Sequence, residues 1–167
     1  SGGIEVKKAI GTRFIGAGLE LGGKDPAYVM ADCNFDHAVE NLVDGSYYNS
    51  GQSCCGIERI YVDEKIFDNF VDAFKAQTEK YILNNPMDNS TNLGPVVKLS
   101  AANNIRNQVS KALNNGAKNI IDGSKFKIDN SENCYVSPSA LINVDHSMEF
   151  MMEETFGPTV GIMKVKN

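Results

Sequence analysis

The sequence predicts an α/β fold with a mostly parallel sheet flanked by helices. Short apolar runs alternate along the chain with longer stretches in which apolar residues recur every three or four positions. Such alternation builds a parallel sheet covered by helices. The chain has 167 residues, of which 42% are hydrophobic and 22% are charged. These values predict an ordinary globular core.

The first half of the chain alternates strand and helix patterns. Residues 13–21 are mostly apolar and contain glycines, which predicts a buried strand that another part of the protein approaches closely. A helix over 32–48 places its apolar residues on one face, and its N-cap is Asp32 or Asn34. In order, the expected elements are a helix over residues 1–10, strands over 13–21 and 27–30, a helix over 32–48, a strand over 60–62 and a helix that Asp63 caps and residues 84–86 stop.

The second half contains the longest helical pattern. Residues 98–115 carry a one-sided apolar stripe, and Gly116 suits the position that follows a helix end. Pro138 interrupts a later extended segment. After a loop over 86–97, the expected elements are a helix over 98–115, a strand over 119–122, a surface loop over 123–133, an extended segment over 135–144, a helix over 145–154 and a final strand over 160–165.

Composition and charge exclude several kinds of partner. The formal net charge is −5 and no basic cluster occurs, so we expect no nucleic acid and no membrane partner. No apolar run approaches the roughly 20 residues that span a bilayer, and no signal-peptide pattern is present. The 4 cysteines include no C-x-x-C pair, which predicts free thiols and no metal site. We therefore expect a cytoplasmic protein, with the mitochondrial matrix as the alternative.

Two adjacent thiols, Cys54 and Cys55, lie in the run N-S-G-Q-S-C-C-G-I-E-R over residues 49–59. The helical pattern breaks before them, so both fall in a turn. A turn after a helix exposes a thiol and surrounds it with backbone N–H groups, which lower its pKa from about 8.5 and favour the thiolate. The alternative is that two small residues fill a tight bend.

Glu20 is the one acid in the apolar run over residues 13–21. A carboxyl group buried among apolar residues has a raised pKa, which suits a general base near neutral pH. The alternative is a carboxylate at a strand end that reaches water or a lysine. Sites in parallel sheets form beyond the C-terminal ends of strands, so Glu20 and Cys54 can face one crevice.

Three segments together resemble the motifs of one enzyme family. Residues 20–26, E-L-G-G-K-D-P, resemble E-L-G-G-K-x-P. Residues 49–59 resemble N-x-G-Q-x-C-x-x-x-x-R, and residues 153–158, E-E-T-F-G-P, resemble E-E-x-F-G-P. These are motifs of the aldehyde dehydrogenase superfamily, in the family's order, and they span nearly the whole chain. The resemblance implies a Rossmann-like, three-layer catalytic domain.

The same resemblance implies an activity: oxidation of a small-molecule aldehyde to a carboxylic acid with NAD or NADP. Cys54 matches the nucleophile that forms a thiohemiacetal and then a thioester, and Glu20 matches the base that activates water. Glu154 matches the acid that holds the nicotinamide ribose, Phe156 the aromatic ring nearby, and Leu21 a backbone contact to the nicotinamide amide. An acid at Glu20 indicates hydrolysis rather than acyl transfer to coenzyme A.

The family's chains run to several hundred residues, so the resemblance covers part of such an enzyme. It implies that residues 1–22 are the C-terminal remnant of a dinucleotide-binding domain and residues 23–167 a partial catalytic domain. The full-length enzyme is expected to be a homo-oligomer, a dimer or tetramer. The fragment alone is expected to fold with little or no activity. The rival hypotheses are a cysteine-dependent esterase, which needs a histidine near the thiol, and a truncated, non-catalytic structural domain.

Overall fold

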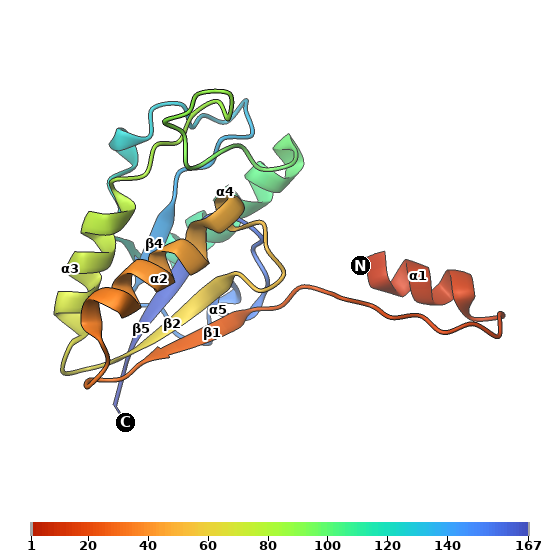
Figure 1. The fold of residues 1–167 in the computed structure, drawn as a ribbon, viewed down its shortest axis with the longest axis horizontal. Helices are drawn as coiled ribbons and strands as arrows, with labels where there is room; N and C mark the ends of the chain where they lie inside the picture. Colours follow the sequence, from red (N-terminus) through yellow and green to blue (C-terminus); the bar gives the residue numbers. More distant parts are fainter. Residues whose placement is uncertain (1, 167) are drawn as a thin grey trace.

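A five-stranded sheet in the order β1-β2-β5-β4-β3 organises the computed structural model, which describes residues 2–166 (Figure 1). Its strands are β1 (Asp25–Val29), β2 (Ile57–Asp63), β3 (Lys118–Asn119), β4 (Ser139–Ile142) and β5 (Thr159–Val165). β1, β2, β5 and β4 run parallel, and only the edge strand β3 pairs antiparallel, with β4. The predicted α/β fold with a mostly parallel sheet is confirmed.

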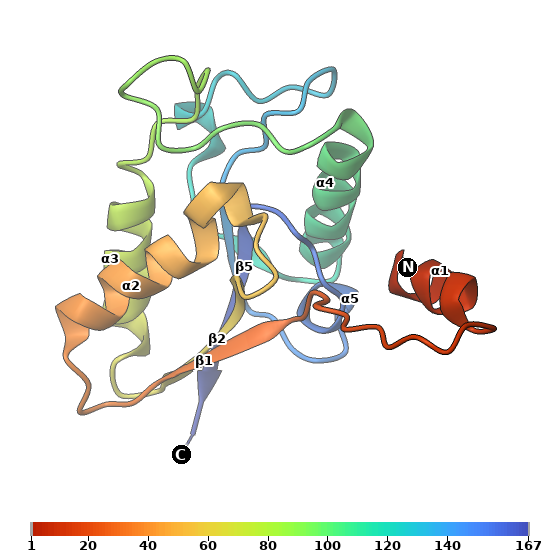
Figure 2. The same cartoon turned by 45° about the vertical axis from the view of Figure 1, so that its right-hand side comes forward.

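Helices cover both faces of this sheet and complete three layers (Figure 1, Figure 2). α2 (Phe35–Tyr47) and α3 (Phe67–Thr78) lie on one face, and α4 (Leu99–Asn114) and the short α5 (Glu149–Met152) lie on the other. No helix among residues 2–166 has the length and apolar character needed to cross a membrane.

Apolar side chains fill the space between the layers. Beneath α2 and α3, Phe70 and Phe74 are fully buried with Ile60 of β2. On the opposite face, Leu141 of β4 packs with Met151 of α5. Each fully buried side chain of this size contributes about 1.5–3 kcal/mol. β2 is thus held firmly in the interior of the sheet, between β1 and β5, and the turn that carries Cys54 leads directly into it.

Residues 2–21 stand apart from this core. α1 (Gly2–Ile10) is helical, as predicted, but residues 13–21 form an exposed segment outside the sheet (Figure 1, Figure 2). The prediction of a buried strand over 13–21 is wrong. A strand needs a neighbour to satisfy its backbone groups, and the sheet begins only at Asp25, with β1 pairing to β2.

Several other predicted elements are shorter in the structure. α3 ends at Thr78, and Ile66 rather than Asp63 occupies its N-cap position. Asp63 instead accepts the backbone N–H of Lys65 (2.9 Å). The predicted segments over 135–144 and 145–154 contract to β4 and α5, and the strand predicted over 119–122 is replaced by β3, which shares only Asn119 with it.

Two terminal residues of helices match the sequence patterns. Asn34, one of the two candidates, caps α2 by accepting the backbone N–H of His37 (3.3 Å). Gly116 follows α4 with φ 98°, the left-handed conformation expected after a helix end.

Two short 3-10 helices lie in the connections between these elements: η1 (Tyr48–Gly51) before the thiols, and η2 (Gly123–Lys125) in the predicted surface loop.

Candidate active site

The three motif segments meet around one buried carboxylate, that of Glu58. This residue is 4% exposed. Its Oε2 lies 2.5 Å from Lys24 Nζ. Its oxygens also accept the backbone N–H groups of Thr155 (2.9 Å) and Phe156 (2.9 Å). Lys24 belongs to the first motif, Glu58 to the second, and Thr155 and Phe156 to the third, so these contacts join stretches far apart in the sequence.

Lys24 is buried together with its partner. Its Nζ also donates to Thr155 Oγ1 (3.1 Å) and lies 5.0 Å from the centre of the Phe150 ring. Burial lowers the pKa of the Lys24 ammonium group, and the Glu58 carboxylate opposes that shift. Arg59 Nε donates to the Lys24 carbonyl oxygen (2.9 Å). Because buried charges need partners, removing either member of the pair leaves the other uncompensated.

A β-bulge in β2 sets the direction of Glu58. Asp25 of β1 pairs with Ile57, but the next residue, Pro26, pairs with Arg59, so Glu58 is an extra residue in β2. Ile57 packs against the cluster beneath α2 and α3. The Glu58 carboxylate instead contacts the residues that precede β1 and follow α5. The bulge therefore aims one acid at the other two motifs without disturbing the core.

The turn before the thiols has an unusual backbone. Asn49, Ser50 and Gly51 have φ values of 50°, 56° and 73°, in the left-handed region that only glycine adopts freely. The Gln52 side chain holds this turn, because its Nε2 donates to the Asn49 carbonyl oxygen (3.1 Å) and its Oε1 accepts the Val97 N–H (2.9 Å). Such a backbone persists only where its surroundings hold it in place.

Gly51 connects this turn to the third motif. A Cβ atom at Gly51 would overlap the Gly157 carbonyl group. On the other side of the turn, Ser50 Oγ donates to the Gly94 carbonyl oxygen (2.8 Å). The turn is therefore fixed between two separate loops of the protein.

Cys54 and Cys55 lie in the next turn, and both are exposed, which confirms the predicted setting of the thiols. The Gly56 N–H donates to the Ser53 carbonyl oxygen (3.1 Å) and closes this turn. Ser53 Oγ lies 3.4 Å from Cys55 Sγ. Among residues 2–166, no acceptor takes the backbone N–H of Cys54. This N–H is therefore free to donate to a group held at the sulfur of the same residue.

Glu154 joins the third motif to the glycines that precede β1. Its Oε1 accepts the backbone N–H of Gly23 (3.1 Å). A Cβ atom at Gly22 would overlap the same carboxylate, so the missing side chain permits this close approach. Phe156 is 41% exposed and has φ 54°. Glu154 and Phe156, the predicted cofactor residues, are thus both exposed, on either side of the buried Thr155.

Glu20 and Leu21 lie on the exposed segment just before these glycines. The expectation that Glu20 is buried is wrong, because the strand over 13–21 does not form. Leu21 is 59% exposed, and its side chain lies against Gly3 of α1. No hydrogen bond within residues 2–166 joins Glu20 to Cys54; the contact observed is the one between Glu154 and Gly23.

Glu58 and Lys24 were not singled out as site residues by sequence reasoning, although both fall in the motifs. One signal was available. Glu58 is an acid inside the strand pattern between Ile57 and Ile60, and an acid in such a place needs a partner. The sequence alone does not show that the partner is a lysine more than thirty positions away.

Among residues 2–166, neither histidine forms a hydrogen bond to Cys54 or Cys55. His146 Nε2 is 2.7 Å from the Tyr61 hydroxyl oxygen, and His37 Nδ1 is 3.2 Å from Asn41 Nδ2. The described residues 2–166 contain no group of three or more side chains that could hold a metal ion. A cysteine esterase with a histidine base gains no support from this arrangement.

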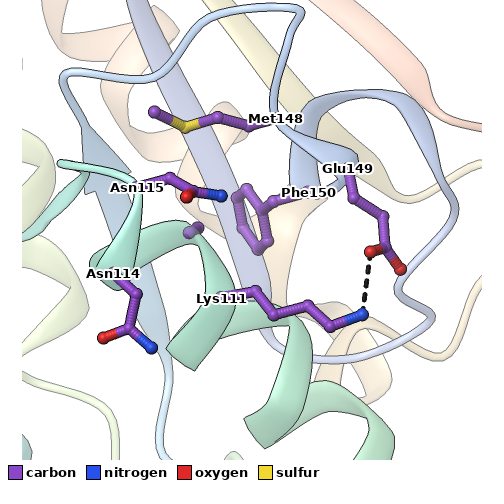
Figure 3. A pocket seen from close by; sticks show the side chains of 7 residues that line it. Lys111, Asn114, Asn115, Met148, Glu149 and Phe150 are labelled. Atoms are coloured by element: carbon purple, nitrogen blue, oxygen red, sulfur yellow. Dashed lines mark hydrogen bonds and ion pairs between the residues drawn. The ribbon is translucent and has the colours of Figure 1, made fainter.

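A separate pocket of ≈ 180 Å³ opens between the end of α4 and α5 (Figure 3). Lys111 and Glu149 form an exposed ion pair at its edge (2.9 Å). Phe150, whose ring lies near Lys24, also lines it. None of the predicted catalytic or cofactor residues lines this pocket, so it is not the candidate active site.

Comparison with known sequences agrees with the motifs. The model of the Aldehyde dehydrogenase family matches residues 1–167. Lactaldehyde dehydrogenase of Methanococcus maripaludis is 33% identical over 169 aligned residues, covering 100% of this chain and 35% of that protein. Cytosolic aldehyde dehydrogenase 1 of Mus musculus is 36% identical over 149 residues, covering 89% of this chain and 29% of that protein. The chain spans about a third of the length of these curated relatives.

Solved structures share the fold. Betaine aldehyde dehydrogenase from Staphylococcus aureus in complex with NAD+ superposes with a TM-score of 0.88 at 30% identity, covering 99% of this chain and 33% of that one. The NADP-dependent glyceraldehyde-3-phosphate dehydrogenase from Bacillus halodurans, complexed with NADP, gives 0.81 at 32% identity, covering 89% and 30%. With a family model that covers every residue and three family motifs packed against one another, this chain belongs to the aldehyde dehydrogenase family.

Proposed function

We propose that this chain carries the catalytic centre of an NAD(P)-dependent aldehyde dehydrogenase that releases a free carboxylic acid. The observation that supports this most strongly is the convergence of the three motifs on Glu58. It connects the turn of Cys54 with the segment of Glu154 and Phe156. A reactive thiol that acts alone, or a turn with no catalytic role, would not need to be connected to the segment of Glu154 and Phe156.

The residues present fit the ribose of a nicotinamide cofactor. Glu154 Oε1 is held by the Gly23 N–H (3.1 Å), and among residues 2–166 its Oε2 has no hydrogen-bond partner. A carboxylate with a free oxygen can accept hydroxyl groups. Phe156, two positions further along the chain, is 41% exposed. When bound, the nicotinamide supplies the hydride acceptor of the reaction.

Cys54 begins the proposed chemistry. Its thiolate attacks the aldehyde carbon and forms a C–S bond, while the carbonyl electrons move to oxygen and create an alkoxide. The free Cys54 N–H is placed to donate to that oxygen, as backbone donors do in oxyanion holes. When the alkoxide collapses, the C=O bond re-forms and the hydride leaves, so the product on Cys54 is a thioester.

Glu20 completes the cycle in this proposal. Its carboxylate removes a proton from water, the water oxygen bonds to the acyl carbon, and the C–S bond breaks. The acid departs and the Cys54 thiolate is restored. Glu20 precedes the glycines that contact Glu154 by only a few positions. The contact of Gly23 with Glu154 at the end of this segment supports a place for Glu20 near the proposed cofactor residues.

In the proposed full-length enzyme, residues 1–22 belong to the dinucleotide-binding domain and residues 23–167 belong to the catalytic domain. Leu21 would then contribute its backbone contact at the junction of the two. Likeness to the cytosolic mouse relative supports a cytoplasmic enzyme, and the family resemblance supports a homo-oligomer.

An ester tests the nucleophile without requiring hydride transfer, because attack on p-nitrophenyl acetate gives the same kind of thioester. We expect mass spectrometry to find one acetyl group on Cys54 in the unmodified chain. Cys55→Ser should keep it and Cys54→Ser should lose it. Glu20→Gln should accumulate the acetylated form, since loss of a general base slows hydrolysis by about 100-fold or more.

Three results would contradict this assignment. One is acetylation of Cys54→Ser at the rate of the unmodified chain. Another is release of the acetyl group at an unchanged rate in Glu20→Gln. The third is complete loss of ester hydrolysis in His146→Ala, which would favour the histidine-assisted esterase. Robust oxidation of acetaldehyde or succinic semialdehyde by the 167-residue chain would separately contradict the expectation that the fragment has little activity.

A further inference from the structure

We propose that Glu58 is a positioning residue that fixes the Cys54 turn relative to the segment carrying Glu154 and Phe156. This inference rests on the proposed function, since it concerns the same site. Glu58 lies four positions after Cys54, at the start of β2. It reaches no exposed surface, so it acts through its neighbours.

Both oxygens of the buried carboxylate are fully engaged. Oε1 accepts the N–H of Phe156 (2.9 Å) and of Thr155 (3.2 Å). Oε2 accepts the N–H of Thr155 (2.9 Å) and the Lys24 ammonium (2.5 Å). Two of these donors are the residues that directly follow Glu154. A shift of the carboxylate therefore moves the proposed cofactor residues directly.

The backbone at Phe156 shows what this contact holds. Phe156 has φ 54°, a conformation that non-glycine residues rarely adopt. Such a conformation persists when the surrounding structure over-determines it. Its N–H is fixed by Glu58, and on its far side Gly157 is packed against Gly51 of the Cys54 turn. Without the carboxylate, we expect the Phe156 backbone to relax from this conformation and its side chain to change direction.

Stability alone does not explain this arrangement. A buried ion pair is weak as a source of stability, and apolar residues of similar volume often replace one without loss. Here the chain also contains a β-bulge at Glu58, while Ile57 keeps its place on the core. Bulges that re-aim one side chain are frequent next to active sites. The bulge affects only this part of β2, and every hydrogen bond of the Glu58 carboxylate is made with a motif residue.

The test compares Glu58→Gln with Ile60→Ala in the 167-residue chain. Gln keeps the shape of the side chain but has a donor NH2 in place of one acceptor oxygen. Either amide orientation therefore takes an acceptor away from the Thr155 N–H and from one of the other two donors, Phe156 N–H or the Lys24 ammonium. Ile60 is fully buried in the same strand on the α2 and α3 face and touches none of the motif contacts. Denaturant is adjusted until both variants have equal unfolding free energies, so that global stability is matched.

Hydrogen exchange at the Thr155 and Phe156 amides is the first measurement. We expect Glu58→Gln to exchange at least tenfold faster at these two amides than Ile60→Ala. The second measurement is protection of Cys54 from iodoacetamide by NADH. The NADH concentration needed should rise about tenfold in Glu58→Gln, while the labelling rate of Cys54 without NADH changes less than threefold.

Equal exchange in the two variants would overturn the proposal and leave Glu58 a general structural residue. If Glu58→Gln does not fold, the double variant Lys24→Met, Glu58→Gln removes the unpaired ammonium and takes its place in both measurements. Exchange needs neither aldehyde nor cofactor. Absence of NADH protection and of Cys54 acetylation in the unmodified chain would therefore refute the proposed function, while fast exchange at the two amides would still uphold the positioning role.

Discussion

At the scale of single residues, Gly51 has two separate structural requirements. Its φ of 73° lies in the left-handed region, and its position against Gly157 has no room for a Cβ atom. Gly116 shares the first requirement without the second, because its φ is 98° and nothing lies within 4 Å of a Cβ built there. Substituting Gly116 therefore tests backbone strain alone, whereas substituting Gly51 tests backbone strain together with steric overlap.

We predict that Gly116→Ala destabilises the protein by about 1–2 kcal/mol, which is the strain of a left-handed alanine. Gly51→Ala should lose the same amount plus about 1–3 kcal/mol of overpacking, or about 2–5 kcal/mol together. Urea unfolding followed by circular dichroism measures both. Equal losses for the two variants would show that the Gly157 contact can relax freely, so the Cys54 turn would not be fixed by the third motif.

Sequence patterns predict the setting of a single residue well where neighbouring residues in the sequence determine it. The break in helical periodicity before Cys54 predicts an exposed turn, and both thiols are exposed. Burial of Glu20 is predicted by an apolar run, yet burial depends on what covers that run. The partners of Glu58 depend on tertiary contacts and on a bulge, and neither has a pattern within one strand.

At the scale of elements, α2 illustrates how a side chain sets a boundary. Asn34 Oδ1 accepts the His37 N–H (3.3 Å), whereas Asp32, the other candidate from the sequence, lies outside the helix. Asn34→Ala should destabilise the protein by about 1 kcal/mol, and Asp32→Ala should leave stability within about 0.5 kcal/mol of the unmodified chain. A thermal or urea unfolding series measures this difference, and a larger loss for Asp32→Ala would assign the cap to that residue.

Helix ends are harder to predict than helix centres. The helix predicted between Asp63 and residues 84–86 forms as α3, whose residues Phe67, Phe70, Val71 and Phe74 recur at helical spacing and are buried, but it stops at Thr78. Thr78 Oγ1 donates to the Phe74 carbonyl oxygen (2.8 Å), a local bond that competes with regular helix geometry. Tyr81 still packs at the edge of the same core without being helical. Periodicity therefore identifies the buried face correctly and overestimates the length.

At the scale of the whole molecule, the chain divides into a folded body and an exposed N-terminal segment. The segment carries Phe14, Ile15 and Leu19, which are all exposed. The sequence predicts a division near residue 22 from the family resemblance alone, and the sheet begins just after it, at Asp25.

The last prediction tests that division. Removing residues 1–21 should leave the free energy of unfolding, measured in urea, unchanged within about 0.5 kcal/mol, because the sheet and its helices begin beyond the cut. Removing residues 1–29 also deletes β1, its parallel pairing with β2 and the buried Val29. This second variant should lose cooperative unfolding or at least about 3 kcal/mol, more than a typical single substitution. If the shorter deletion is as damaging as the longer one, residues 1–21 belong to the folding unit and the boundary near residue 22 is wrong.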